Sequence, residues 1–575
     1  MSVVELASGR NLAARLGGRG REIAALGGIL ALATVLRFVN LPLRGGWDSD
    51  QGTEMLALRH ALQTGTLPTF GPVSSLGNFH HGALSRDIEL PAAWLGNGDP
   101  IWVVGEVALL SLLVVIAAWW IARSISGQAA GLAAALIAAV SASQIGYATF
   151  IWNPTPVEPG AAVAYLGAWA AVSRRSARWW VVAAAGAALA AQSHVAAAVI
   201  VVPLAGAFAL DLYRGPAGSR RSVLTWGAAG VALFVATYLP QIAFELGHDF
   251  ADERGMLAYF TSSSTATAFD PLARLAFAII RILAWPLTRW PLIELRPAFP
   301  AALVAAAGLI GGLGWRMRAT LSPRGQLRTA TGSDYTTAHE LEADLAEATI
   351  DVPAYAAVRG LAGAIPGAMR LPDELLGTWL VGLGLASLVL MLGLGLHSVS
   401  EVQDLPTEQY HIVADPLVFV AAGIVLGALW RSVGAVRVRI VRRATVLAIL
   451  AALIAWNAAH VPPLDSRDGG WPAAQAAATR VEQAARGSTV AVVPLFAAKG
   501  ADAYLYPLER DGVTLVSPDG ASTVVLLCDT YWLTGCGGTA EQEWLAQNAA
   551  ASGLVLVDRF AAAPDRLLSV YRRTR

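Results

Sequence analysis

Charged residues are scarce in this chain of 575 residues: Asp, Glu, Lys and Arg make up 14%, against about 25% in a typical soluble domain. The shortage excludes a water-soluble globular protein and a disordered chain, because so many apolar runs could be buried only in lipid. Basic residues are not in excess either, since 41 Lys and Arg balance 41 Asp and Glu. We therefore predict a polytopic, α-helical membrane protein without a nucleic-acid partner.

Apolar segments of about the 20 residues that a bilayer requires recur along the chain, and they predict about eleven membrane-spanning helices. They lie at 23–40, 101–122, 129–148, 157–172, 179–192, 195–213, 222–243, 298–315, 375–397, 411–430 and 444–460. Arginine is concentrated in the tail 1–22 and in alternate links, such as 174–178, 214–221 and 431–443. By the positive-inside rule these faces are cytoplasmic, and an odd number of spans in the cell membrane then places the C-terminus outside.

The segment 269–297 is apolar yet contains Arg274, Arg281 and Arg289, whose spacing puts them on one face of a helix. A further span here would reverse the orientation of the arginine-rich link that follows. We therefore expect an amphipathic helix that lies on the outer membrane surface.

Three polar parts flank or interrupt the transmembrane region 23–460: an outer loop 41–100, a cytoplasmic loop 316–374 and a tail 461–575. Only the tail is long enough for a domain, and its β-branched runs alternate with helical stretches, which predicts a small extracytoplasmic α/β domain. The only two cysteines, Cys528 and Cys536, lie in this tail. Outside the cytoplasm they could form a disulfide, while two buried free thiols remain the alternative.

Ionisable residues in or beside spans gather on the predicted outer side. They are Asp48, Asp50, Glu54, His80, His81, Glu106, Glu158, His194, Glu245, His397, His411 and Asp415. No chain of charges continues to the inner face, which argues against an ion pump and for a reaction centre at the outer surface. Activated nucleotide sugars do not cross the membrane, so such a centre would need a lipid-linked donor, a carboxylate base and groups that hold a leaving phosphate.

The sequence Trp47-Asp48-Ser49-Asp50-Gln51-Gly52 follows the first span and precedes a helical run. Asp50 near the N-terminus of that helix would be favoured as an ionised base by the helix dipole and the free backbone amides. The alternative is that Asp48, Ser49 or Asp50 merely caps the helix. A D-x-D pattern also suggests a divalent cation, Mg or Mn.

His80 and His81 are adjacent in a loop and are followed by Gly82, which allows close backbone approach. Paired imidazoles could bind a phosphate or complete a metal site with the aspartates. Surface histidines without a role are the alternative.

These motifs together resemble the C-type glycosyltransferases that use polyprenyl-phosphate donors, specifically the protein O-mannosyltransferase and lipid A aminoarabinose transferase group. Leu36 to Leu41 followed by 47–52 resembles the group's first span and D-E-x loop, with Gln51 in place of the second acid. The same order continues through the motifs Phe79-His80-His81-Gly82, Ile151-Trp152-Asn153-Pro154, Gln192-Ser193-His194 and Gln409-Tyr410-His411. Gln51 leaves a metal requirement open.

The resemblance implies an inverting displacement in which Asp50, or else Asp48, takes the proton of an acceptor hydroxyl and polyprenyl phosphate departs. It implies a phosphate site and a substrate pocket on nearby side chains. For the phosphate we name His80, His81, Arg86, Arg281 and Arg289, and for the pocket Glu54, Glu158, His194, Tyr410 and His411. Structural roles are the alternatives: the arginines of the surface helix would reach lipid headgroups, Glu158 would cap a helix, and the histidines would pack between helices.

We therefore expect a glycosyltransferase of the cell envelope that acts on a lipid, glycan or protein acceptor. The alternatives are a transporter or flippase of a lipid-linked saccharide and a non-catalytic scaffold whose tail binds cell-wall polymer. A flippase would need inverted repeats or an inward route, which the sequence does not suggest.

Overall fold

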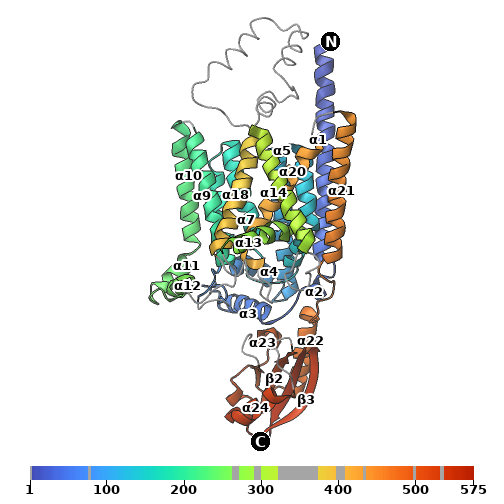
Figure 1. The fold of residues 1–575 in the computed structure, drawn as a ribbon. Helices are drawn as coiled ribbons and strands as arrows, with labels where there is room; N and C mark the ends of the chain where they lie inside the picture. The colour runs from blue at the N-terminus through green and yellow to red at the C-terminus, as the bar shows by residue number, and fades with distance from the viewer. Residues whose placement is uncertain are drawn as a thin grey trace.

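The computed structural model describes residues 3–574 except 75–78, 216, 262–270, 290–298, 322–372, 396–407, 432–434, 496–499 and 531–536. Most of the predicted cytoplasmic loop 316–374 therefore lies outside the described residues. The molecule consists of a helical bundle and a smaller α/β domain at one end of it (Figure 1). We call the end of the bundle nearest that domain the domain-side end.

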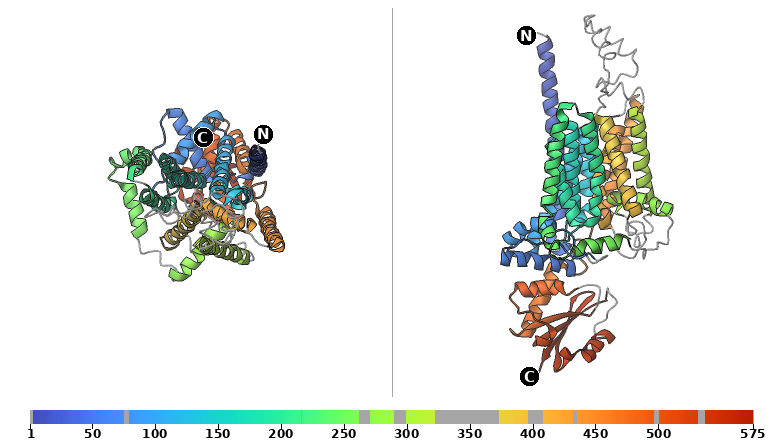
Figure 2. Two further views of the ribbon diagram at one scale, coloured as in Figure 1. Left: turned by 90° about the horizontal axis from the view of Figure 1, so that it is seen from above. Right: turned by 90° about the vertical axis from the view of Figure 1, so that its left-hand side faces the viewer.

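The bundle consists of long apolar helices that run side by side (Figures 1 and 2). They are α1 (Val3–Phe38), α5 (Pro100–Val140), α7 (Val157–Arg174), α8 (Trp179–Ser193), α9 (Val201–Arg214), α10 (Ala217–Ala236), α14 (Phe299–Leu321), α18 (Asp373–Gly395), α20 (Asp415–Trp430) and α21 (Val436–His460). Each predicted span coincides with one of them. Among the described residues five helices are long and apolar enough to cross a membrane, and the bent pair α10–α11 would be a sixth. The total of eleven stays a prediction.

Helix α5 contains two of the predicted spans. Its backbone leaves helical geometry at Ser126 and Gly127, where Gly127 has φ 78°. Gly131 then packs directly against Trp119 and Arg123, so the second half of α5 folds back on the first. A glycine in the left-handed region makes this tight reversal inexpensive.

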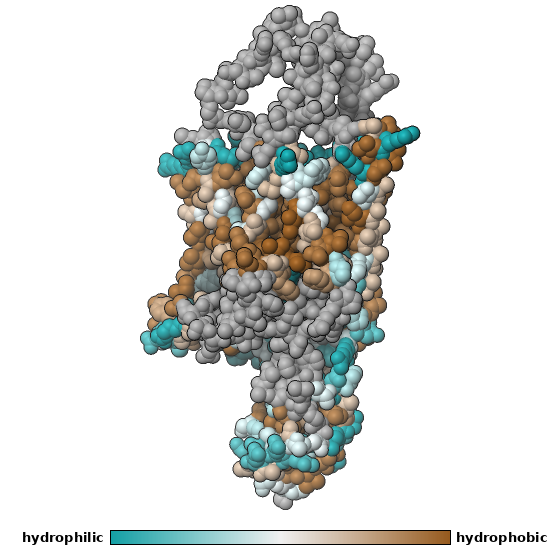
Figure 3. Space-filling view, viewed as in Figure 1, coloured by the Kyte–Doolittle hydropathy of each residue, from teal (hydrophilic) through white to brown (hydrophobic). Residues whose placement is uncertain are grey.

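Hydrophobic side chains cover the middle of the bundle, whereas hydrophilic ones gather at the end opposite the C-terminal domain and on that domain (Figure 3). Inside the bundle the core is built largely from alanine and β-branched residues, which allow close helix packing. This pattern is that of a bundle surrounded by lipid.

Short helices cover the domain-side end. They are α2 (Leu41–Arg44), α3 (Ser49–Thr64), α4 (Leu84–Leu95), α6 (Ala142–Tyr147), η1 (Val195–Ile200), α11 (Leu239–Glu245), α12 (Ala251–Thr261), α13 (Pro271–Thr288), η3 (Glu408–Tyr410) and η4 (Ile412–Ala414). Helix α13 lies across the bundle axis, as the amphipathic pattern predicts (Figures 1 and 2). Its residues 282–285 are buried, however, so this part of the helix packs within the protein and not only on lipid.

The C-terminal domain is a four-stranded sheet with strand order β1-β2-β4-β3, in which β1 and β2 are parallel and the other pairs antiparallel. Its elements are α22 (Gly470–Ala485), β1 (Val490–Pro494), α23 (Asp502–Arg510), η5 (Pro518–Gly520), β2 (Thr523–Asp529), α24 (Thr539–Gln547), η7 (Ala549–Ala551), β3 (Leu554–Ala563) and β4 (Arg566–Arg573). Every residue of β2 is buried, which explains why this strand reads as a continuous apolar run. The predicted α/β character of the tail is correct.

One hydrophobic core joins the domain to the bundle. Trp47, which directly precedes α3, packs against Trp471 of α22 with ring centroids 4.6 Å apart and against Tyr506 of α23 at 6.0 Å. The Trp47 indole also donates to the backbone oxygen of Ala503 at 2.8 Å. Since Trp47 is 3% exposed, it fixes the domain against the segment that begins α3.

Candidate active site

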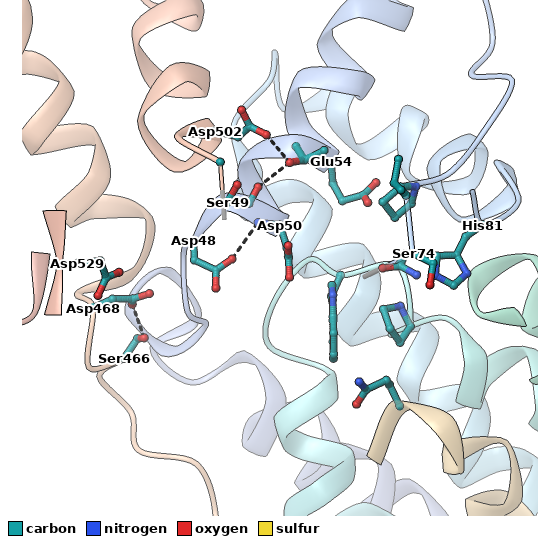
Figure 4. A pocket seen from close by; sticks show the side chains of 18 of the residues that line it. Asp48, Ser49, Asp50, Glu54, Ser74, His81, Ser466, Asp468, Asp502 and Asp529 are labelled. Atoms are coloured by element: carbon teal, nitrogen blue, oxygen red, sulfur yellow. Dashed lines mark hydrogen bonds between the residues drawn. The ribbon is translucent and has the colours of Figure 1, made fainter. Parts of the chain in front are cut away.

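A cavity of about 930 Å³ lies between the domain-side end of the bundle and the C-terminal domain. The bundle contributes the start of α3, parts of two loops, His194 and Tyr410, and the domain contributes the remaining wall (Figure 4). Six of the predicted site residues line it: Asp48, Asp50, Glu54, His81, His194 and Tyr410. Segments far apart in sequence thus meet at one place.

Asp48 and Asp50 have different local roles. Asp48 is the N-cap of α3: its Oδ1 accepts from the backbone N–H of Asp50 at 2.9 Å. Asp50 sits in the first turn, half-buried, and its side chain lies between Asp48 and His81 in the view of Figure 4. The free amides and dipole of the helix N-terminus favour a negative charge there.

Gln51 completes the cap. Its Oε1 accepts from the backbone N–H of Asp48 at 2.9 Å, and its Nε2 donates to the backbone oxygen of Ile151 at 2.7 Å. Only an amide can accept and donate in this way, because a carboxylate has no proton to give. The departure from the D-E-x pattern therefore has a structural reason.

His81 and His194 lie side by side, with ring centroids 4.8 Å apart and ring planes tilted by 31°. In each ring Nδ1 accepts a backbone N–H, from Val195 at 3.4 Å and from Ala196 at 3.3 Å respectively. A neutral ring bonded in this way carries its proton on Nε2. Burial, with smaller effects of His80 and Arg86, lowers the pKa of His81 to about 4, so this ring is neutral at pH 7.

His80, the neighbour of His81 in the sequence motif, contacts a different part of the protein. Nδ1 of His80 lies 3.0 Å from both carboxylate oxygens of Asp252, and His80 is not among the residues that line the cavity. Arg86 is likewise outside the lining. Its guanidinium donates to Glu54 at 2.7 Å and to the backbone oxygen of Phe70 at 2.9 Å, an arrangement that neutralises the buried Glu54.

Arg281 of α13 and Arg289, which directly follows that helix, are also not among the residues that line the cavity. Arg281 is 1% exposed, and its Nε donates to Nε2 of His411 at 3.1 Å, so it does not reach lipid headgroups. Arg289 donates to the backbone oxygen of His460 at 2.6 Å. The role that we predicted for both arginines in binding phosphate stays a prediction.

Glu158 is buried near the start of α7 and hydrogen-bonds to Gln144 and to Asp415. Neither Glu158 nor His411 is among the residues that line the cavity. Their contacts are those of polar groups that connect helices; Glu158 does not cap α7, whose N-cap is Pro156, and the pocket role predicted for both residues stays a prediction. Their side-chain direction, which sequence periodicity does not give, separates them from Asp50.

The sequence reasoning missed the wall that the C-terminal domain contributes. It comprises Ser466, Arg467, Asp468, Gly500, Asp502, Asp529, Ala563, Asp565 and Arg566. The clusters 465–468 and 565–566, which concentrate charge next to structured segments of the tail, were the available signal. They could not be recognised as one wall because the fold alone brings them together.

Among the described residues no group of three or more His, Cys, Asp or Glu side chains is arranged to hold a metal ion. Gln51 uses both ends of its amide within the protein, so the residues present do not form a two-carboxylate metal site of the D-E-x kind. Metal dependence stays untested.

Cys528 is buried in β2 and is disulfide-bonded. Its predicted partner Cys536 lies outside the described residues, so the pairing itself stays a prediction.

Comparison with known proteins shows which family model and which solved structures this chain resembles. Residues 96–242, which begin just before α5 and end in α11, match the family model described as dolichyl-phosphate-mannose-protein mannosyltransferase. The crystal structure of ArnT from Cupriavidus metallidurans in the apo state superposes with a TM-score of 0.54 at 12% identity, over 94% of this chain and 97% of that one. The fold is that of the C-type glycosyltransferases.

The same C-type fold occurs in the cryo-EM structure of the arabinofuranosyltransferase AftD from Mycobacteria, with a TM-score of 0.51 and 15% identity, over 97% of this chain and 40% of that one. ArnT has also been crystallised bound to undecaprenyl phosphate, and that structure gives the same TM-score of 0.54 at 12% identity. No curated protein sequence matches the chain. The resemblance that the motifs indicated is confirmed.

Proposed function

We propose that this protein is an integral membrane glycosyltransferase that moves a sugar from a polyprenyl-phosphate-linked donor to an acceptor hydroxyl at the outer face of the cell membrane. The observation that carries the proposal is the position of Asp50: it lies in the first turn of α3, in a cavity where the end of a lipid-facing bundle meets a polar domain. A carboxylate so placed is within reach of a substrate whose tail remains in lipid.

The proposed reaction is one inverting displacement. Asp50 takes the proton of the acceptor hydroxyl, and the acceptor oxygen forms a bond to the anomeric carbon. The bond from that carbon to the phosphate oxygen breaks, and polyprenyl phosphate leaves with the electron pair. Asp48, which already accepts a backbone N–H as the cap of α3, is the second candidate for the base.

The leaving phosphate needs hydrogen-bond donors. His81 and His194 are each more than nine-tenths buried, and neither Nε2 has a protein partner within the described part of the chain. Two neighbouring Nε2–H groups would stabilise the negative charge that develops on the leaving phosphate. They support the predicted role of His81 in binding phosphate and extend that role to His194.

The test uses purified protein with labelled polyprenyl-phosphate sugars and measures the release of polyprenyl phosphate. Asp50→Asn is expected to lower the rate by at least about a hundredfold, since general-base catalysis contributes roughly 10²- to 10⁴-fold. Asp48→Asn is the matched variant, because asparagine also caps helices. It should retain most activity.

The reverse result, loss in Asp48→Asn and activity in Asp50→Asn, would assign the base to Asp48. A flippase would move the lipid-linked saccharide without cleaving it, and a scaffold would be unaffected by either change. Wild-type protein that cleaves none of the donors contradicts the proposed function.

A further inference from the structure

The C-terminal domain is an integral part of the cavity and does not merely lie near it. Arg566 donates to the backbone oxygen of Trp47 at 2.7 Å, and Thr53 of α3 donates to Asp502 at 2.5 Å. A side chain at Gly52 would overlap the main chain of Asp502. The wall from the domain is therefore held against the same turn of helix that carries Asp50.

The charged groups of this wall are paired. Arg566 contacts Asp529 at 2.8 Å and Asp468 at 3.6 Å, and Arg467 contacts Asp565 at 2.7 Å. Each pair presents carboxylate oxygens next to guanidinium N–H groups. Such a pair can accept from and donate to the same hydroxyl-bearing ligand, since every hydroxyl is both a donor and an acceptor.

The charge of the lining argues against an anionic ligand on this wall. Four of the carboxylates that line the cavity belong to this wall, as do its two arginines, and both arginines already contact aspartates. A phosphorylated or carboxylated acceptor would be repelled there. A cationic acceptor would instead require bare carboxylates, whereas Asp468 already accepts from Ser466, from the backbone N–H of Trp47 and from that of Gly470.

Two further features of the cavity fit a carbohydrate. The indole of Trp152 lines it and stacks beside Phe150 at 5.9 Å, and an aromatic ring offers a surface for the apolar face of a sugar. The Nε2 atoms of His81 and His194, which have no protein partner among the described residues, belong to the bundle's part of the lining, where the tail of a lipid-linked donor would arrive. The wall of the C-terminal domain is then left for the other substrate.

We propose that the C-terminal domain forms the acceptor subsite and that it recognises an uncharged glycan through the pairs Arg566–Asp529 and Arg467–Asp565. The proposal rests on the proposed function, because it assigns the second substrate of that reaction. The acceptor's terminal sugar lies against Trp152 and the paired side chains, with one hydroxyl directed to Asp50.

The experiment measures kcat and KM for transfer from a labelled polyprenyl-phosphate sugar that the wild type cleaves. The acceptor probes are octyl-linked neutral tetrasaccharides of mannose, galactose or arabinofuranose. The same chains with a terminal phosphate monoester and a Ser/Thr-containing peptide are tested in parallel.

The test variant is Arg467→Gln/Asp565→Asn, which removes one pair from the wall and leaves Arg566, which also bonds to the backbone of Trp47, unchanged. The matched control is Arg480→Gln/Asp558→Asn, a surface pair at 2.7 Å in the same domain that does not line the cavity. The test variant is expected to raise KM for the neutral glycan by about tenfold while kcat changes less, the effect of losing one or two charge-assisted hydrogen bonds. The control should keep the wild-type KM.

Transfer to phosphorylated chains or peptides alone, transfer to none of the neutral chains, or an equal KM in wild type and test variant overturns the acceptor assignment. These outcomes are distinct from failure of the proposed function, in which the wild type releases no polyprenyl phosphate at all.

Discussion

Gln51 lies within the motif that carries the candidate base, and its amide makes two hydrogen bonds inside the protein. Its amide ties Asp48, which caps α3, to the backbone of Ile151 in the link before α7. The two bonds hold the cap and hence the direction of Asp50. The residue thus positions the candidate base without facing the reaction itself.

We predict that Gln51→Glu destabilises the protein by about 1 to 3 kcal/mol, because the buried oxygen of Ile151 loses its donor and faces a carboxylate instead. Thermal unfolding of the purified protein measures the effect. Gln63→Glu in the same helix, at an exposed position, is the control. Equal midpoints for the two variants would show that the amide has no such role.

At this scale the sequence predicts the site only in part. The helix signal after Trp47 correctly placed Asp50 and Asp48 together, because capping depends on neighbours in the chain. We predicted Arg281 for the phosphate site and His411 for the substrate pocket, and the two side chains bond to each other inside the bundle. The direction in which a buried polar side chain points depends on which helices surround it, and no local pattern encodes this.

Helices α3 and α23 make the contact on which the site depends. Gly52 lets the backbones approach, and Thr53 in the next position binds Asp502 at the start of α23. A glycine at this point of the motif therefore has a packing reason that is independent of chemistry.

We predict that Gly52→Ala forces α23 away from α3 and lowers transfer by about tenfold or more, since small displacements of a catalytic group are costly. Protease cleavage of the link 461–469 should become faster as the domain detaches. Gly28→Ala is the control, since a Cβ there meets nothing within 4 Å and glycine is unfavourable in a helix. Unchanged transfer and cleavage in Gly52→Ala would show that the contact is dispensable.

The sequence predicts the helices and strands better than it predicts the contacts between them. Hydropathy located the long helices of the bundle that the structure describes, including the two halves of α5, because a long apolar run can be recognised in the sequence without knowledge of its neighbours. In the tail, the β-branched runs 489–493 and 523–527 identified β1 and β2. The antiparallel pair β3 and β4 was missed because several of its residues are exposed or polar.

For the whole molecule, arginine content predicts which end faces the cytoplasm. Exposed arginines cluster at the start of α21, at the end of the bundle opposite the C-terminal domain (Figure 1). The positive-inside rule then puts that end inside the cell and the cavity outside.

We predict that a cysteine introduced at Asp519, exposed on the C-terminal domain, reacts with a membrane-impermeant maleimide in intact cells. A cysteine at Arg437, exposed at the start of α21, should react only after permeabilisation. The protein without either substitution measures the background labelling, which should be low because Cys528 is buried and disulfide-bonded. The opposite labelling pattern would place the cavity on the cytoplasmic side. It would contradict the proposal that the reaction occurs at the outer face of the membrane.

The bond between Arg566 and Trp47 joins residues that are 519 positions apart. A ribosome therefore completes nearly all of the helices before the last wall of the pocket exists. In the orientation that the positive-inside rule predicts, that wall must also cross the membrane before it docks. Until the C-terminal domain docks, Asp50 is open to bulk water, because the opposite wall of the cavity is absent. For the proposed transferase, the order of synthesis thus delays the first catalytic cycle until the C-terminal domain has folded against the start of α3.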